Sequence, residues 1–159
     1  MNIRTKDHLV VIVAGIGMLL STLDTGIINV ALPFLKSYFE TTADIAAIAV
    51  TGYTISLAVF ILPFGLLSDK FGKLSFSYIG LIIFGLSSLL CGLSANIQML
   101  IMFRIFQSIG AAALQATSAS LITTLVSAEK SSSAIGVLGI MIGVGPVLGP
   151  SLGGLLLSL

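Results

Sequence analysis

The stretch IAAIAVTGYTISLAVFILPFGLL, residues 45–67, contains no charged side chain. A helix needs about 20 apolar residues to cross the hydrocarbon core of a bilayer. The stretch is too long and too uniformly apolar for a barrel strand, which alternates over about 10 residues. Backbone N–H and C=O groups find no water partner in lipid, so the segment must satisfy them internally. We therefore expect residues 45–67 to form a transmembrane helix.

Four similar apolar stretches accompany this one, and short polar segments separate them. They cover residues 9–33, 74–94, 97–122 and 134–159. Hydrophobic residues make up 57% of the 159-residue chain and charged residues only 8%, whereas a soluble domain carries about 25% charged residues. The sequence thus predicts an all-α integral membrane protein, a bundle of five transmembrane helices over residues 1–159 with the lipid bilayer as its solvent.

The composition argues against several classes of site. Cys91 is the only cysteine and His8 the only histidine, so an internal disulfide or a thiolate metal cluster cannot form. We expect no metal and no cofactor. The chain has no basic run that would bind nucleic acid. It also lacks a nucleophile, a base and a third orienting group near one membrane surface, so we do not expect an enzyme.

Positive charges are distributed unevenly among the connections. Five of them fall before the first helix, between the second and third, and between the fourth and fifth: Arg4, Lys6, Lys70, Lys73 and Lys130. Only Lys36 falls on the other side. Short loops rich in Lys and Arg stay in the cytoplasm. The pattern predicts a multi-pass protein of the cell membrane with a cytoplasmic N-terminus.

Two ionisable residues, Asp24 and Arg104, interrupt apolar stretches. Each costs roughly 2.5–3.5 kcal/mol at the centre of a span on insertion scales. Counting at about 1.5 Å per residue from the outer ends of their helices places both at a similar depth, roughly 10–14 Å below the outer surface. We expect them to be partners. One interpretation is a structural ion pair that joins the first helix to the fourth; the other is a site of proton or substrate coupling.

Three amides also lie within the expected spans: Asn29, Gln107 and Gln115. An amide in a span often ties one helix to another. The alternative is that these side chains are polar groups of a substrate cavity.

The last apolar stretch is rich in glycine and proline. Gly145, Gly149 and Gly153 recur every four residues and form one smooth helix face, which lets another helix approach closely. Pro146 and Pro150 each remove a backbone hydrogen bond and favour a kink. The pattern fits simple close packing or a contact at which two helix bundles rock. In a chain of five predicted helices, this face has nothing obvious to pack on.

Four segments resemble signature motifs of the major facilitator superfamily, in the order in which that family carries them. Residues 65–73 resemble the motif of the loop between helices 2 and 3, residues 100–112 the helix 4 motif with its arginine, and residues 143–154 the helix 5 antiporter motif. Residues 23–33 resemble the helix 1 motif of the 14-helix drug:proton antiporter branch, the EmrB/QacA type. Three positions depart from the motifs: Gly26 replaces a usual threonine, Ser108 a usual glycine, and Leu74 a frequent basic residue.

The resemblance implies roles for these residues. Asp24 and Arg104 would take part in proton coupling. Asp69 would belong to a charge relay that latches the two halves of a transporter on the cytoplasmic side, and Gly65 and Gly72 would permit tight packing and turning there. The alternative for Asp69, Lys70 and Lys73 is an ordinary solvated turn that sets topology. The helix 5 motif would lie between the two halves of a transporter; it comprises Gly143, Gly145, Pro146, Gly149, Pro150, Gly153 and Gly154.

The resemblance also implies an activity, proton-coupled efflux of drugs or other small amphipathic molecules across the bacterial cytoplasmic membrane. Members of the family place substrate between two six-helix halves, and this chain corresponds to helices 1–5. We expect a truncated transporter that is inactive alone and whose partners are the missing C-terminal helices or another chain, with substrate and protons as partners of the full-length parent. Two alternatives are a facilitator of another solute, such as a sugar, amino acid or organic anion, and a small membrane protein that acts by helix association.

Overall fold

The computed structural model describes the backbone of residues 3–157 and the side chains of residues 10–155. Arg4, Lys6 and His8 therefore lie outside the described side chains. The described chain forms five helices joined by short connections. They are α1 (Ile3–Tyr38), α2 (Ala43–Phe71), α3 (Lys73–Gly92), α4 (Ile97–Leu125) and α5 (Ala128–Leu157).

The helices begin and end at residues suited to those positions. Thr42 and Asn96 precede α2 and α4 in extended conformation, and their side-chain oxygens accept hydrogen bonds from the backbone N–H groups of Ile45 and Met99. Such N-caps satisfy donors that have no partner within the helix. Gly72 alone separates α2 from α3 and has a φ of 94°, a conformation that side chains with a Cβ rarely adopt. This glycine makes the sharp turn that the resemblance implied.

The helices extend beyond the predicted spans into the polar segments. The segment 127–133, expected to be a connection, lies almost wholly in α5, which starts at Ala128. Residues with charged or hydroxyl side chains can continue a helix outside the hydrocarbon, where water solvates them. All five helices are long and apolar enough to cross a membrane. Where the hydrocarbon boundaries fall along them stays a prediction.

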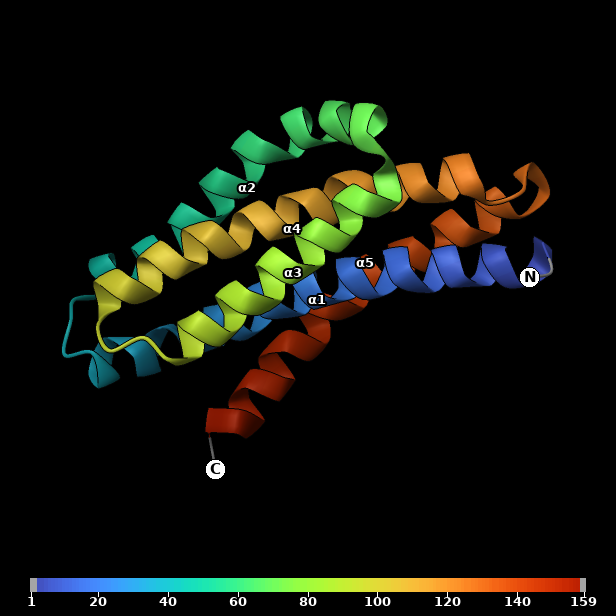
Figure 1. Cartoon of the computed structure of the whole chain (residues 1–159). Coiled ribbons are helices and arrows are strands. Elements are labelled where there is room, and N and C mark those ends of the chain that lie inside the picture. The colour runs from blue at the N-terminus through green and yellow to red at the C-terminus, as the bar shows by residue number, and fades with distance from the viewer. Residues whose placement is uncertain (1–2, 158–159) are drawn as a thin grey trace.

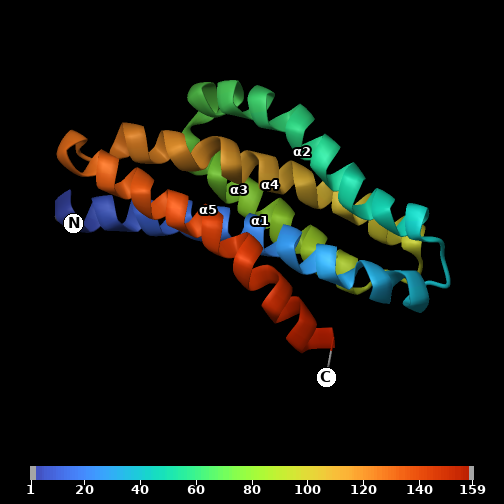
Figure 2. The same ribbon diagram turned by 180° about the vertical axis from the view of Figure 1, so that it is seen from behind.

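Consecutive helices run in opposite directions (Figure 1). The α2–α3 and α4–α5 connections lie toward the same end of the bundle as the N-terminus, and the other two connections lie at the opposite end (Figure 2). The segments that carry most of the positive charge thus share one end, as the charge pattern requires. Which side of the membrane that end faces stays a prediction.

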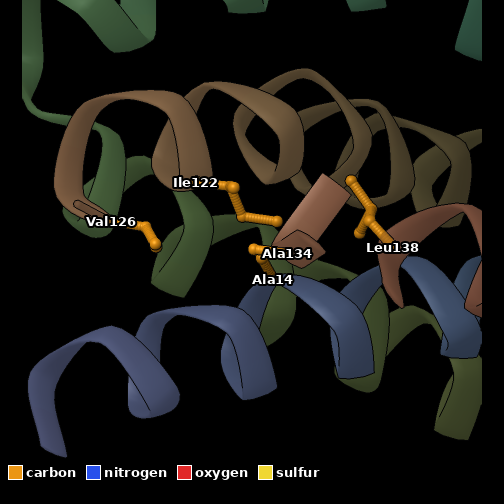
Figure 3. Packing of buried hydrophobic residues seen from close by; sticks show 5 residues of the cluster. All are labelled: Ala14, Ile122, Val126, Ala134 and Leu138. Carbon is orange, nitrogen blue, oxygen red and sulfur yellow. The ribbon is translucent and has the colours of Figure 1, made fainter. Parts of the chain in front are cut away.

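Helix α4 is the centre of the bundle and packs on α1, α2 and α3, whereas α5 packs mainly on α1. Three clusters of buried apolar side chains hold this arrangement. One joins α1, α4 and α5 and is drawn in Figure 3: Ala14, Ile122, Val126, Ala134 and Leu138. A second joins α2, α3 and α4 through Tyr53, Phe84, Ala111 and Leu114. A third joins α1 to α4 through Leu35, Ile97 and Leu100.

The outer surface of the bundle is apolar. Large hydrophobic side chains on α2, α3 and α5 are strongly exposed, among them Leu62, Leu89 and Val147. A soluble monomer rarely presents so much contiguous apolar surface to water. This surface fits a lipid environment.

Two pairs of helices approach each other through glycines. A Cβ added to Gly110 of α4 would lie 2.5 Å from the backbone nitrogen of Phe84 and 2.7 Å from the carbonyl oxygen of Gly80, both on α3. A Cβ added to Gly149 of α5 would lie 2.6 Å from the Cα atom of Gly26 on α1. These contacts are too short for any side chain, so α3 packs on α4, and α5 on α1, with backbone against backbone.

Helix α5 bends, and its C-terminal part diverges from the rest of the bundle (Figure 1; Figure 2). Pro146 and Pro150 lie within this helix. Each lacks a backbone N–H, and its ring clashes with the carbonyl of the preceding turn, which bends a helix. The kink expected from the sequence is present.

Candidate functional site

The two ionisable residues of the apolar spans lie together in the middle of the bundle. Nη1 of Arg104 on α4 donates a hydrogen bond to Oδ2 of Asp24 on α1 at 2.5 Å. The Arg104 side chain is 3% exposed, while that of Asp24 is 23% exposed. The expected pairing is confirmed. Within the five described helices, the carboxylate is therefore less enclosed than the guanidinium.

Gln107 completes the pair one turn along α4. Its Oε1 accepts a hydrogen bond from Arg104 Nη1 at 2.7 Å, and its Nε2 donates to Oδ1 of Asp24 at 3.0 Å and to Oγ of Ser88 on α3 at 2.7 Å. The buried Gln107 amide thus joins three helices, as we expected of an amide that ties one helix to another. Both oxygens of the Asp24 carboxylate accept a hydrogen bond.

An aromatic ring covers the guanidinium. The Cζ atom of Arg104 lies 4.3 Å from the ring centroid of Tyr53 on α2, within range of a cation–π interaction. Among the described residues, Nε and Nη2 of Arg104 have no hydrogen-bond partner. Asp24, Gln107 and the Tyr53 ring are therefore the groups that stabilise this buried cation.

A second set of hydrogen bonds adjoins the first. The Tyr53 hydroxyl lies 3.3 Å from Oγ of Ser21 on α1, and Nε2 of Gln115 on α4 donates to the same Oγ at 2.9 Å. Ser21 is fully buried. Gln115 thus ties α4 to α1, whereas Gln107 joins three helices.

Asn29 differs from the two glutamines. Its side chain is exposed, and Nδ2 donates to the carbonyl oxygen of Thr25 on the same helix at 2.9 Å. It does not join α1 to another helix. A place in a substrate cavity stays a prediction for Asn29.

The loop motif forms a small polar cluster at the end of the bundle that holds the N-terminus. Lys73 Nζ lies 3.2 Å from Oδ1 of Asp69 and donates to Oγ1 of Thr124 at the end of α4, 2.7 Å away. Lys70 is exposed. A Cβ added to Gly65 would meet no atom within 4 Å, so this chain does not show the tight packing expected there. The role of Asp69 in a relay between two halves stays a prediction.

The glycine face of α5 has a partner within the chain, although the sequence showed nothing obvious for it to pack on. Gly145 packs against Thr22, Gly149 against Gly26, and Gly153 against the carbonyl oxygen of Ile27, all on α1. Helix order in space does not follow helix order in sequence, so α5 lies on α1. The remaining motif glycines, Gly143 and Gly154, have open space. Association with another chain through the face of Gly149 is disfavoured because α1 already covers it.

The sequence patterns did not point to Tyr53, Ser21 or Ser88. A tyrosine, unlike phenylalanine, brings a hydroxyl that needs a partner when it is buried, so Tyr53 in an uncharged stretch was a usable signal. The serines carried no such signal, since serine is common in membrane helices. No group of three or more His, Cys, Asp or Glu side chains in the described part of the chain is placed to hold a metal ion.

The comparisons with known proteins agree with this architecture. The family model described as Major Facilitator Superfamily matches residues 14–159. The chain belongs to the major facilitator superfamily. Members of this family are transporters rather than enzymes, and the five apolar helices make the chain a multi-pass protein of the cell membrane.

Two curated relatives and one solved structure illustrate the similarity. The chain is 36% identical over 153 residues to the riboflavin transporter RibZ of Clostridioides difficile, covering 96% of this chain and 34% of the relative. It is 36% identical over 151 residues to the multidrug resistance protein Stp of Mycobacterium tuberculosis, covering 94% of this chain and 28% of the relative. The chain therefore spans about a third of the length of these relatives.

The solved structure supports the fold. It is a crystal structure of a bacterial homologue of the human lysosomal transporter Spinster in an inward-facing, unoccupied conformation. The TM-score is 0.82 at 22% sequence identity, and the match covers 94% of this chain and 31% of that one. The five helices are thus arranged as in a major facilitator.

Proposed function

We propose that this chain forms the first part of a proton-coupled exporter of drugs or other small amphipathic molecules. The observation that supports this most is the Asp24 carboxylate, which is partly accessible yet held by Arg104 and Gln107 inside an apolar bundle. A carboxylate inside a membrane protein usually marks a proton or substrate pathway. The multidrug resistance protein among the relatives supports a drug as cargo.

The geometry suggests how a proton would act. The charged carboxylate accepts hydrogen bonds from Arg104 on α4 and Gln107, and so holds α1 against α4. A proton that binds Asp24 removes the negative charge and weakens both bonds. The unprotonated and protonated states then favour different arrangements of the helices, and a ligand that binds one arrangement better shifts the equilibrium toward it. A proton entering from outside and leaving to the cytoplasm would exchange for a drug that moves outward.

The test is Asp24→Asn in a transporter in which this segment is joined to the remaining helices of the family architecture. Asparagine keeps the size and one acceptor oxygen but does not exchange a proton at neutral pH. We expect efflux of a fluorescent drug such as ethidium, driven by a proton gradient in inverted vesicles, to fall to the level of empty vesicles. Asp44→Asn, which alters an exposed carboxylate in the first turn of α2, is the matched control and should leave efflux unchanged.

Membrane content of each variant has to be measured alongside, because removing one partner of a buried ion pair costs about 3–5 kcal/mol. Gradient-driven efflux by Asp24→Asn at the wild-type rate, with equal protein in the membrane, would remove Asp24 from the coupling mechanism.

A second candidate function keeps the fold and changes the cargo. The similarity to the riboflavin transporter supports a flavin-sized heteroaromatic solute. Competition decides between the two: if riboflavin blocks ethidium movement at micromolar concentration and is itself transported, the vitamin is the better cargo. If riboflavin has no effect while ethidium moves, the drug exporter is favoured.

A further inference from the structure

Arg104 poses a physical problem that the ion pair alone does not solve. The residue is 2% exposed, and a buried cation without compensating partners is strongly disfavoured. In the proposed function, which this inference builds on, Asp24 loses its charge in every transport cycle when it binds a proton. Gln107 Oε1 still accepts one hydrogen bond from Nη1, but a single neutral acceptor does not replace a carboxylate. A further group must then help to stabilise the guanidinium, or Arg104 must leave its place.

Tyr53 meets the requirement for such a group. Its ring lies under the guanidinium, with 4.3 Å between Arg104 Cζ and the ring centroid, and the negative face of an aromatic ring attracts a cation most strongly where water is excluded. The ring carries no charge and does not change when Asp24 is protonated. The attraction between ring and guanidinium therefore does not itself require a charge on Asp24.

Groups on α1, α3 and α4 hold this ring in position. Tyr53 extends from α2, and its hydroxyl lies 3.3 Å from Ser21 Oγ on α1, which in turn accepts a hydrogen bond from Gln115 on α4. Tyr53 is itself 2% exposed and packs with Phe84, Ala111 and Leu114. The ring thus has little room to move, and its position does not depend on Asp24.

We propose that Tyr53 is a positioning residue that keeps Arg104 in place while Asp24 is protonated. The ring acts through Arg104 and need not touch the drug. With Arg104 retained, the ion pair re-forms as soon as Asp24 releases its proton. Without the ring, Arg104 leaves the site when Asp24 is neutral, and each cycle must bring it back.

The chain permits a direct spectroscopic test, because Arg4 and Arg104 are its only arginines. The 159-residue protein, labelled with ¹⁵N-arginine in lipid nanodiscs, gives two side-chain N–H signals, of which Arg4 serves as the reference. The ring current of Tyr53 should shift the Arg104 signal upfield. Asp24→Asn mimics the neutral carboxylate, and we expect the shift to survive in that variant and to vanish in Tyr53→Leu. An Arg104 signal that loses its upfield shift in Asp24→Asn overturns the proposal.

Transport kinetics of the complete transporter provide the second test. For ethidium efflux driven by a proton gradient, we expect Tyr53→Leu to lower kcat about tenfold or more and to change KM less than about twofold. Tyr53→Phe keeps the ring and should retain at least about half of kcat. Phe84→Leu removes a ring from the same buried cluster and keeps the Tyr53 ring that stacks on Arg104, so it reports on packing and should reduce kcat much less than Tyr53→Leu.

Two kinetic results would contradict the proposal. Tyr53→Leu with wild-type kcat shows that Arg104 needs no ring, and equal losses in Tyr53→Leu and Phe84→Leu show a purely structural role. The two hypotheses fail separately. If Asp24→Asn transports normally, the proposed function fails; if Asp24→Asn is inactive while Arg104 loses its ring-current shift there, only the role of Tyr53 fails.

Discussion

Replacing Gly149 by alanine tests the closest contact between α1 and α5. The added Cβ would lie 2.6 Å from Gly26 Cα, 2.9 Å from Gly26 C and 3.0 Å from the Ile27 nitrogen. Carbon atoms in van der Waals contact prefer about 3.5–4.0 Å. All three neighbours are backbone atoms that no rotamer change can move, so the two helices must separate by about 1 Å.

The cost follows from two opposing effects. Forcing extra volume into a well-packed contact costs about 1–3 kcal/mol, while alanine in place of glycine favours the helix by about 0.8–1 kcal/mol. Gly143→Ala is a matched control in the same helix, since a Cβ at Gly143 meets no atom within 4 Å. The propensity gain is common to both variants. We therefore expect Gly149→Ala to be less stable than Gly143→Ala by about 1–3 kcal/mol.

Reversible unfolding of the chain in mixed micelles, followed by circular dichroism or steric trapping, measures this difference. It corresponds to a change of about 5- to 150-fold in the unfolding equilibrium. Equal stability of the two variants, within about 0.5 kcal/mol, would show that α5 does not pack on α1 through Gly149, and the arrangement of the two helices would have to be revised.

Two further substitutions test other contacts by the same unfolding measurement. Gly110→Ala places a Cβ 2.5 Å from the Phe84 nitrogen. It should destabilise the chain by about 1–3 kcal/mol relative to Gly85→Ala, whose Cβ meets open space. A stabilised Gly110→Ala would refute the close approach of α3 and α4. Lys73→Ala removes the ion pair with Asp69 and the hydrogen bond to Thr124, both near the surface. It should lower the free energy of unfolding by only about 0–1 kcal/mol. A decrease above about 2 kcal/mol, with Lys70→Ala neutral, would show instead that this cluster is a major source of stability.

The number and type of the helices could be predicted from hydropathy, because lipid leaves the backbone few alternatives to a helix. The pairing of Asp24 with Arg104 could also be predicted, since both residues lie at a similar depth and a buried charge needs a partner. Neither inference required knowledge of which helix lies beside which. Both follow from large free-energy costs: that of a backbone group without a partner in lipid, and that of a buried charge without a partner.

The neighbours of the pair could not be predicted in the same way. Whether Gln107 reaches Asp24, or whether the Tyr53 ring covers Arg104, depends on helix rotation and on the order of helices in space. The same limit explains why the sequence showed no obvious partner for the glycine face of α5. The smoothness of its face was visible in Gly145, Gly149 and Gly153, but the matching surface of α1 consists of Thr22, Gly26 and Ile27, and only Gly26 resembles a packing signal.

The structure also explains why glycine replaces the usual threonine at position 26. The motif that residues 23–33 resemble usually has threonine at this position. A Cβ on residue 26 would lie 2.9 Å from Gly149 Cα and 3.2 Å from the carbonyl oxygen of Gly145. The glycine therefore permits the close approach of α5, and a threonine in this chain would force the two helices apart.

The most direct test of the central claim, that Asp24 carries the proton exchanged for drug, is a measurement of proton movement itself. The complete transporter is reconstituted in liposomes that contain a pH-sensitive dye, and an ethidium gradient is imposed without a pH gradient. The account predicts that ethidium movement drives protons in the opposite direction in the wild type and in Asp44→Asn, and drives none in Asp24→Asn, although that variant still binds ethidium. Proton movement of wild-type size in Asp24→Asn would contradict it.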